Sequence, residues 1–186
     1  MGFDQATVAE QAHSWLRACA RVMALCAQEP RQSEMVRCLL RRLEEVRPLD
    51  FRPSPLPALA RLSWVKDMKL AREFREFAHF LPWESSPRTT DQGREVAIMA
   101  FGSMFELGDV ATGLMYVDSY QAYPEHNHLP DEIYFLVSGT ARWRYGGHHD
   151  YRSVAAGNLL YNHPWDRHGV KAGAAPVLAL FLSCPA

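Results

Sequence analysis

The stretch YQAYPEHNHLPDEIYFLVSG, residues 120–139, decides how the rest of the chain is interpreted. His126 and His128 are two residues apart, so on an extended strand their side chains point to the same face. The Leu-Pro-Asp break after them lets the chain turn, and Glu132 then begins the next apolar run. Two imidazoles and a carboxylate that converge from adjacent strands are typical of a metal site with open coordination positions.

A fourth ligand is expected from a later strand, and two histidines are candidates. In the stretch GNLLYNHPWDRHG, residues 157–169, Pro164 predicts a turn between His163 and His168. We prefer His168, which stands just beyond the turn. His163 is expected to lie at the surface or to support a ligand.

From about Phe80 onward, apolar and polar residues alternate with a period of two in the C-terminal part of the sequence. Apolar runs bounded by Gly, Pro, Asp, Asn or His-rich turns lie at 95–101, 112–118, 132–138, 140–145, 158–162 and 176–183. Short runs at this spacing, with no helical pattern between them, favour an antiparallel barrel or sandwich. The segment RYGGHH, residues 144–149, predicts the tip of a hairpin.

The N-terminal part has a helical period instead. Apolar residues at spacings of three and four predict a helix over 7–27, with Thr7 and Glu10 as a capping box. A second helix is predicted over 30–46, because a proline suits its first position and apolar residues mark one face. A weaker pattern predicts a third helix over 59–77.

We therefore expect a mainly β fold in two parts. Residues 1–80 form a helical N-terminal extension, and residues 81–186 form a small antiparallel β-barrel with the metal site. A chain of 186 residues suits one domain with such an appendage. The apolar stripe of the first helix is interpreted as core that covers a sheet edge or forms a contact in a homodimer, and the sequence does not choose between the two.

Composition and charge argue against several classes of partner. Twenty Lys and Arg against 21 Asp and Glu give a net charge of −1, which supplies no field to capture nucleic acid or an anionic membrane. No apolar run approaches the ~20 residues of a membrane helix, and no secretory signal is visible. The four cysteines form no CxxC pair. We expect reduced thiols in a cytoplasmic protein.

Two segments of the chain resemble the motifs of the cupin superfamily: His126-x-His128-x-x-x-Glu132 followed by Gly139, and Pro164-x-x-x-His168. Tyr120 stands where the first motif usually has Gly, and Ala155 stands where the second often has Pro, but neither change removes a ligand. The resemblance implies a double-stranded β-helix. It also implies, position by position, four metal ligands: His126, His128, Glu132 and His168.

A longer match resembles the cupin-type dimethylsulfoniopropionate (DMSP) lyases and their lyase-like relatives: Tyr123-Pro-x-His126-x-His128-x-x-x-Glu132-x-Tyr134, then Gly139 and Trp143. It covers most of the C-terminal 100 residues closely, and the helical part in outline. It implies an enzyme that splits DMSP into dimethyl sulfide and acrylate with a divalent metal ion and a tyrosine base, and Tyr134 matches the position of that base. The ligand set accepts Fe, Zn, Mn, Ni or Co, so the sequence does not identify the ion.

Elimination from this substrate needs a strong base and a site for a sulfonium group. Tyr134 is two residues from Glu132 and therefore shares its strand face. Tyr123 is the second candidate for the base, or a hydrogen-bond donor. Aromatic faces attract a methylated cation, and the aromatic residues expected to contact it are Tyr120, Trp143 and Trp165. Phe135 is excluded because it alternates to the opposite face.

The same residues also suit other functions. The same ligands suit a dioxygenase or isomerase acting on another small carboxylate, or a non-enzymatic, metal-dependent small-molecule-binding cupin. The sequence has no helix-turn-helix or basic stripe, which argues against a DNA-binding regulator. Glu125 and Asp131, which flank the ligands, are expected to be solvated turn residues.

Overall fold

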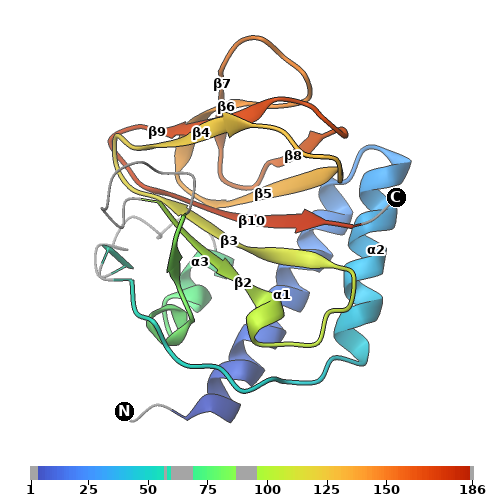
Figure 1. Cartoon of the computed structure of the whole chain (residues 1–186), viewed down its shortest axis with the longest axis vertical. Coiled ribbons are helices and arrows are strands. Elements are labelled where there is room, and N and C mark those ends of the chain that lie inside the picture. The colour runs from blue at the N-terminus through green and yellow to red at the C-terminus, as the bar shows by residue number, and fades with distance from the viewer. Residues whose placement is uncertain (1–3, 57, 60–68, 87–95, 185–186) are drawn as a thin grey trace.

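The computed structural model describes residues 4–56, 58, 59, 69–86 and 96–184. Three layers are stacked in it: a four-stranded antiparallel sheet, a six-stranded antiparallel sheet below it, and helices against the far side of the larger sheet (Figure 1). Helices precede strands along the chain. The mainly β class with N-terminal helices is confirmed, and the two sheets form a cupin-like sandwich rather than a barrel closed by hydrogen bonds.

The first two predicted helices are confirmed as α1 (Gln5–Cys26) and α2 (Pro30–Glu44). The predicted Thr7–Glu10 capping box is wrong. Asp4 is the N-cap, and its carboxylate accepts a hydrogen bond from the main-chain N of Thr7 at 3.3 Å. The third helix, α3, covers only Lys69–Phe74 of the predicted range, of which 60–68 lie outside the described residues.

All six predicted apolar runs contain a strand. The larger sheet has the order β1 (Glu84–Ser85), β2 (Val96–Ala100), β3 (Ala111–Val117), β10 (Val177–Ser183), β5 (Glu132–Ser138) and β8 (Leu159–Asn162). The smaller sheet has the order β4 (Ala122–His126), β9 (His168–Ala172), β6 (Thr140–Arg144) and β7 (Arg152–Ala155). The predicted hairpin tip joins β6 to β7, and Gly146 and Gly147 supply the positive φ angles that it needs.

The larger sheet is buried on both faces, and strand alternation divides its residues between two cores. Ile133, Phe135 and Val137 of β5 pack in one core with the residues of α1 and α2. Tyr134 and Leu136 pack in the other core, between the two sheets. Phe135 therefore points away from Tyr134, as predicted, and the interior that holds Tyr134 is separate from the helical side.

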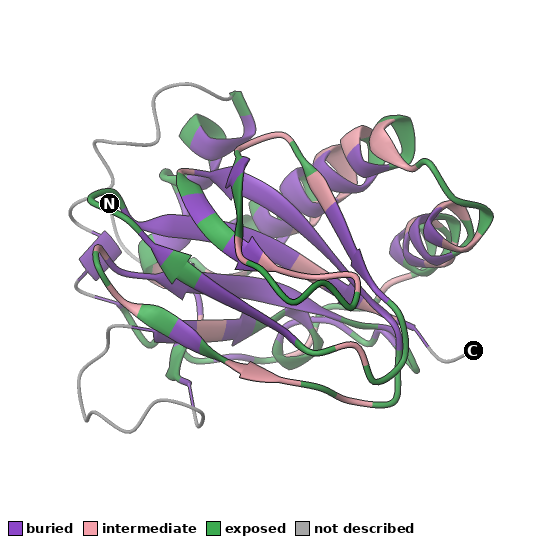
Figure 2. Cartoon of the chain, turned by 90° about the horizontal axis from the view of Figure 1, so that it is seen from above, coloured by how far each residue is buried: buried purple, intermediate pink, exposed green. Residues whose placement is uncertain are grey.

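The apolar stripe of α1 belongs to the core that also contains one face of this sheet. Its buried face includes Trp15, Leu16 and Cys19, and the Trp15 indole donates to the carbonyl of Leu70 in α3 at 2.6 Å. Figure 2 shows buried residues along most of the strands and on one side of the helices. The four cysteines are free thiols. Among the described residues, no helix has the length and apolar character needed to cross a membrane.

Candidate active site

Four predicted metal-site residues meet at one end of the space between the sheets. His126 ends β4 and His168 begins β9, and the two residues are direct partners in the antiparallel register. Glu132 begins β5 in the facing sheet. His128 lies beyond the end of β4, so the loop that follows the strand, rather than strand alternation, places it near His126.

The distances define a compact cluster. One ring nitrogen from each of His126, His128 and His168 lies within 4.8 Å of the others. The Oε2 atom of Glu132 is 3.3 Å from Nε2 of His128 and 3.1 Å from Nε2 of His168. His163 is outside this cluster: it is exposed, and its ring contacts that of Tyr161 at 4.6 Å.

Main-chain carbonyls orient all three imidazoles. Nδ1 of His126 donates to the carbonyl of Pro124 at 2.9 Å, and Nδ1 of His128 donates to that of Pro130 at 2.8 Å. Nδ1 of His168 donates to the carbonyl of Asp166 at 2.9 Å. A hydrogen on Nδ1 leaves the lone pair of a neutral imidazole on Nε2, which fixes the tautomer and the coordinating atom.

This arrangement fits a divalent metal ion. The Nε2 lone pairs of neutral His128 and His168 would face a carboxylate oxygen at 3.1–3.3 Å, so a positive charge, either a proton or a metal ion, must stand between them. Nε2 of His168 is also buried and makes no well-aligned hydrogen bond within the described part of the chain. Three imidazoles and one carboxylate suit several transition metals. The cluster could therefore bind such an ion.

Glu132 supplies negative charge to the cluster. Burial raises the pKa of its carboxyl group, but the adjacent imidazoles of His128 and His168, which favour the ionised carboxylate, outweigh burial and bring the pKa to about 2. The side chain therefore stays ionised near neutral pH, as a metal ligand must.

Both predicted catalytic tyrosines lie beside the cluster and are almost fully buried. The ring of Tyr134 is 6.1 Å from that of His168, and the ring of Tyr123 is 4.9 Å from that of His126, measured between centroids. Both belong to the core between the sheets, which also contains the inward side of β5. The shared face of Tyr134 and Glu132 predicted from the sequence is consistent with this placement.

The three predicted substrate-contacting aromatics are in different environments. Trp143 is buried, and its ring lies 5.1 Å from that of Tyr134. Trp165 is 60% exposed, and its main-chain N donates to the carbonyl of His128 at 2.8 Å, which places its backbone beside the cluster. Tyr120 is 78% exposed, ahead of β4. A role in substrate binding stays a prediction for all three.

Two acidic residues that flank the ligands form ion pairs, in contrast to the expectation of solvated turn residues. Asp131 is 5% exposed and forms an ion pair with Arg31 of α2 at 2.7 Å. Glu125 lies within β4, and its carboxylate pairs with Arg144 at 2.6 Å and with Arg167 at 3.3 Å. Pairing across the fold, which is not visible in local sequence, accounts for both.

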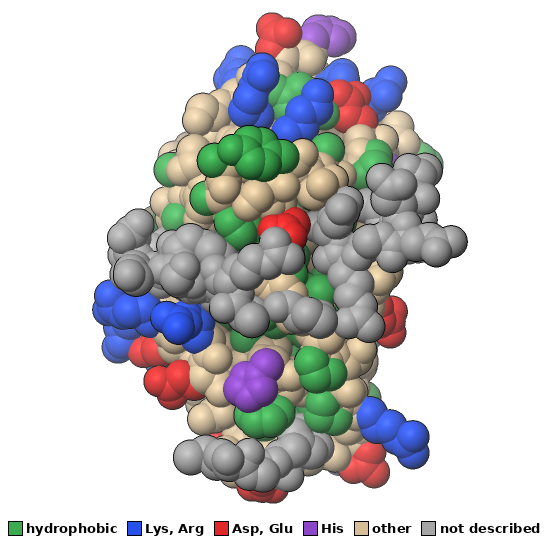
Figure 3. Space-filling view, turned by 90° about the vertical axis from the view of Figure 1, so that its left-hand side faces the viewer, with side chains coloured by type: hydrophobic (Ala, Val, Ile, Leu, Met, Phe, Trp, Pro, Cys, Tyr) green, Lys and Arg blue, Asp and Glu red, His purple; other side chains and the backbone are tan. Residues whose placement is uncertain are grey.

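Basic side chains gather at the end of the molecule formed by the smaller sheet, where Figure 3 shows them mixed with acidic groups. Several lie on or next to its strands: Arg142, Arg144, Arg152, Arg167 and Lys171. Because Arg144 and Arg167 pair with Glu125, part of this positive charge is compensated.

Sequence reasoning missed Asn162. It stands directly opposite Glu132 in the β5–β8 register, its Oδ1 accepts from the main-chain N of Gly146 at 3.1 Å, and its buried Nδ2 has no partner among the described residues. The only sequence signal was a polar residue that ends an apolar run.

Comparisons with known proteins agree with this fold. A chain from the crystal structure of the DMSP lyase DddQ from Ruegeria pomeroyi DSS-3 is similar over 92% of this chain and 91% of its own, with 21% identity and a TM-score of 0.68. A chain from the crystal structures of the DMSP lyases RdDddP and RnDddQII is similar over 98% of this chain and 95% of its own, with 16% identity and a TM-score of 0.71. No curated protein matches the sequence significantly. The family model for dimethylsulfoniopropionate lyase matches residues 56–179. Because this match spans more than half of the sequence, the chain belongs to the dimethylsulfoniopropionate lyase family.

Proposed function

We propose that this protein is a metal-dependent carbon–sulfur lyase that cleaves DMSP to dimethyl sulfide and acrylate by β-elimination. The observation that supports this most is the convergence of three imidazoles and Glu132 beside two buried tyrosines, in a chain of the DMSP lyase family. The proposed ligands are His126, His128, Glu132 and His168.

The difficulty of the reaction is the weak acidity of the C–H bond next to the substrate carboxylate. A divalent ion held by the four ligands would supply Lewis acidity toward that carboxylate. The protein's own contribution is to fix the ligands: the carbonyl of Pro124 orients His126, and that of Pro130 orients His128. Low exposure of His168 and Glu132 keeps bulk water from the ligand atoms.

Tyr134 is the proposed base. Its phenolate oxygen takes the proton from the carbon next to the carboxylate, the electron pair of that C–H bond forms the new C=C bond, and the C–S bond breaks. Dimethyl sulfide leaves with the electron pair of the broken C–S bond, and acrylate remains. Tyr134 later releases the proton to solvent. Tyr123, beside His126, is the second candidate for this role or a donor to the bound substrate.

The sulfonium end of the substrate is assigned to aromatic side chains. Trp143 lies against Tyr134 in the interior, and the backbone of Trp165 adjoins His128. A methylated cation over such rings gains about 0.5–2 kcal/mol. Tyr120 is the third proposed contact.

Headspace measurement of dimethyl sulfide tests the proposal. Purified protein with DMSP is expected to release dimethyl sulfide and acrylate in equal amounts, to stop after treatment with a chelator, and to resume when a divalent ion is restored. Absence of both products from metal-loaded protein would overturn the proposed substrate. Consumption of another small carboxylate by that protein would then support the isomerase or dioxygenase alternative.

A further inference from the structure

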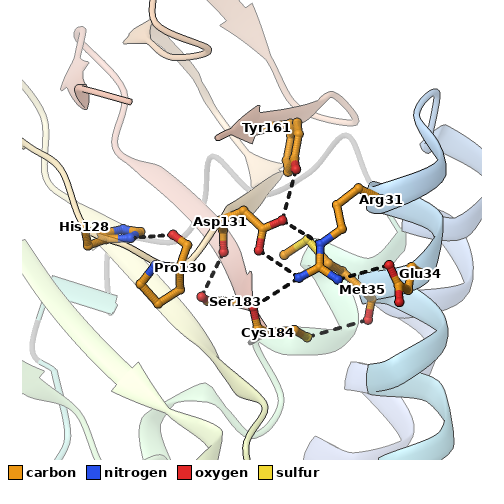
Figure 4. Close-up of polar contacts among 9 residues, drawn as sticks. All are labelled: Arg31, Glu34, Met35, His128, Pro130, Asp131, Tyr161, Ser183 and Cys184. Atoms are coloured by element: carbon orange, nitrogen blue, oxygen red, sulfur yellow. Dashed lines mark hydrogen bonds and ion pairs between the residues drawn. The ribbon is translucent and has the colours of Figure 1, made fainter. Parts of the chain in front are cut away.

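A side chain of the helical extension reaches the segment that carries the metal centre (Figure 4). Arg31 lies in the first turn of α2. Its guanidinium donates two hydrogen bonds to the Asp131 carboxylate, from Nε to Oδ2 at 2.7 Å and from Nη2 to Oδ1 at 3.1 Å. Such two-pronged, charge-assisted contacts fix direction as well as distance. The separation of 100 positions along the chain makes this a tertiary contact rather than a local turn.

Asp131 is held from further directions. The Tyr161 hydroxyl of β8 donates to its Oδ2 at 3.0 Å, and the Ser183 hydroxyl of β10 donates to its main-chain carbonyl at 2.9 Å. Arg31 Nη2 also reaches the carbonyl of Cys184 at 3.4 Å.

The position of Asp131 in the chain connects this contact to the ligands. The preceding residue, Pro130, offers the carbonyl that orients the His128 ring, and the following residue is Glu132. Fixing Asp131 therefore fixes the peptide units on both sides of it. Rotation of either unit would move the acceptor of His128 or the carboxylate of Glu132.

We propose that Arg31 and Asp131 are positioning residues through which the helical extension sets the geometry of the metal centre. The inference rests on the proposed metal-dependent function and adds a role for α2 in it. Without the pair, His128 and Glu132 would have to be ordered when the ion binds, so ion affinity would fall.

Co²⁺ titration of metal-free, full-length protein tests this, with a competing chelator to measure affinity and visible absorption to report coordination geometry. Arg31→Gln and Asp131→Asn are expected to weaken Co²⁺ binding by about 10- to 100-fold, the usual effect of losing a supporting contact. Arg31→Lys keeps the positive charge but cannot make the paired hydrogen bonds of the guanidinium. Its Co²⁺ affinity should fall between those of these variants and wild type.

The matched control is Arg42→Gln. Arg42 lies on the same helix and forms an ion pair with Asp109 at 3.0 Å, away from the ligand segment. Its loss should leave Co²⁺ affinity within about twofold of wild type, because an exposed ion pair contributes little to stability. Tyr161→Phe, which removes one hydroxyl that donates to Asp131, provides a milder variant if the others fold poorly.

The outcomes separate the two proposals. Weaker binding and an altered Co²⁺ spectrum in the Arg31, Asp131 or Tyr161 variants, but not in the Arg42 variant, would support the inference. Wild-type affinity and spectrum in folded Arg31 and Asp131 variants would overturn it and leave the proposed function intact, as would an equal loss in the Arg42 control. Failure of the wild-type protein to bind Co²⁺ would overturn the metal-dependent function, and this inference with it.

Discussion

The ionisation of Glu132 couples the metal centre to the stability of the fold. Its pKa is about 2 in the folded chain against an ordinary value of 4.5, so the folded state holds the proton less tightly than the unfolded state. The resulting stability is present above pH 4.5 and is lost as the pH falls toward 2. The size of the effect is roughly 3 kcal/mol for a shift of this order.

Urea unfolding of metal-free protein at a series of pH values measures this contribution. The free energy of unfolding of wild type should decline over that acid range more steeply than that of Glu132→Gln, so that the two curves converge. Parallel curves would contradict the depressed pKa.

The roles of the two tyrosines can be distinguished by removing the hydroxyl oxygen of each in turn. Tyr134→Phe removes the proposed base but keeps the ring that packs against Trp143, so turnover should fall to background while bound metal stays at the wild-type level. Tyr123→Phe should retain measurable turnover. Dimethyl sulfide release and elemental analysis on the same samples check both, and an active Tyr134→Phe enzyme would transfer the role to Tyr123.

The turn between β5 and β6 depends on a glycine. Gly139 has φ +91°, and a Cβ there would lie 2.4 Å from the carbonyl oxygen of Pro176. Both the backbone conformation and the space exclude a side chain, which explains the glycine of the cupin-like motif in physical terms. We expect Gly139→Ala to destabilise the fold by about 2 kcal/mol or more.

Thermal unfolding measures that loss, which corresponds to a fall in Tm of roughly 4–8 °C in a chain of this size. Gly173→Ala is the matched control, because a Cβ at Gly173 meets nothing within 4 Å. An equal shift in both variants would show that the turn does not have this requirement.

How far the sequence predicted each element depended on its burial. Strands with long apolar runs, such as β3 and β10, were found because both of their faces are buried. Strand β9, with the sequence HGVKA, is short and mixed, and β4 contains a proline and a histidine, so neither has a clear alternating pattern. Their positions follow from pairing with each other, which local sequence does not encode.

The metal-site residues were easier to predict than their supports. Histidines and a carboxylate at ligand spacing leave a local signature, and the structure brings all four together. Arg31 and Asp131 are 100 residues apart, and only the packing of α2 against the sheets reveals their pairing. Because this partner is distant in sequence, Asp131 was wrongly expected to be exposed to solvent.

At the level of the whole molecule, the helices and the larger sheet share one hydrophobic core. Ile133, Phe135 and Val137 are buried in it with the apolar faces of α1 and α2. A chain limited to residues 81–186 would expose that face of the sheet to water. We expect it to be aggregated or unfolded, whereas the full chain should show the dispersed NMR spectrum of a packed protein. A well-folded fragment would make the extension a separate unit.

The proposed activity depends on one ion at the cluster of His126, His128, His168 and Glu132. The most direct test is to titrate metal-free protein with a divalent ion while following dimethyl sulfide release from DMSP. The rate should start at background, rise in proportion to added ion, and level off at about one ion per chain, while His168→Ala stays at background throughout. Undiminished release from metal-free protein, or full activity in the His168 variant, would contradict it.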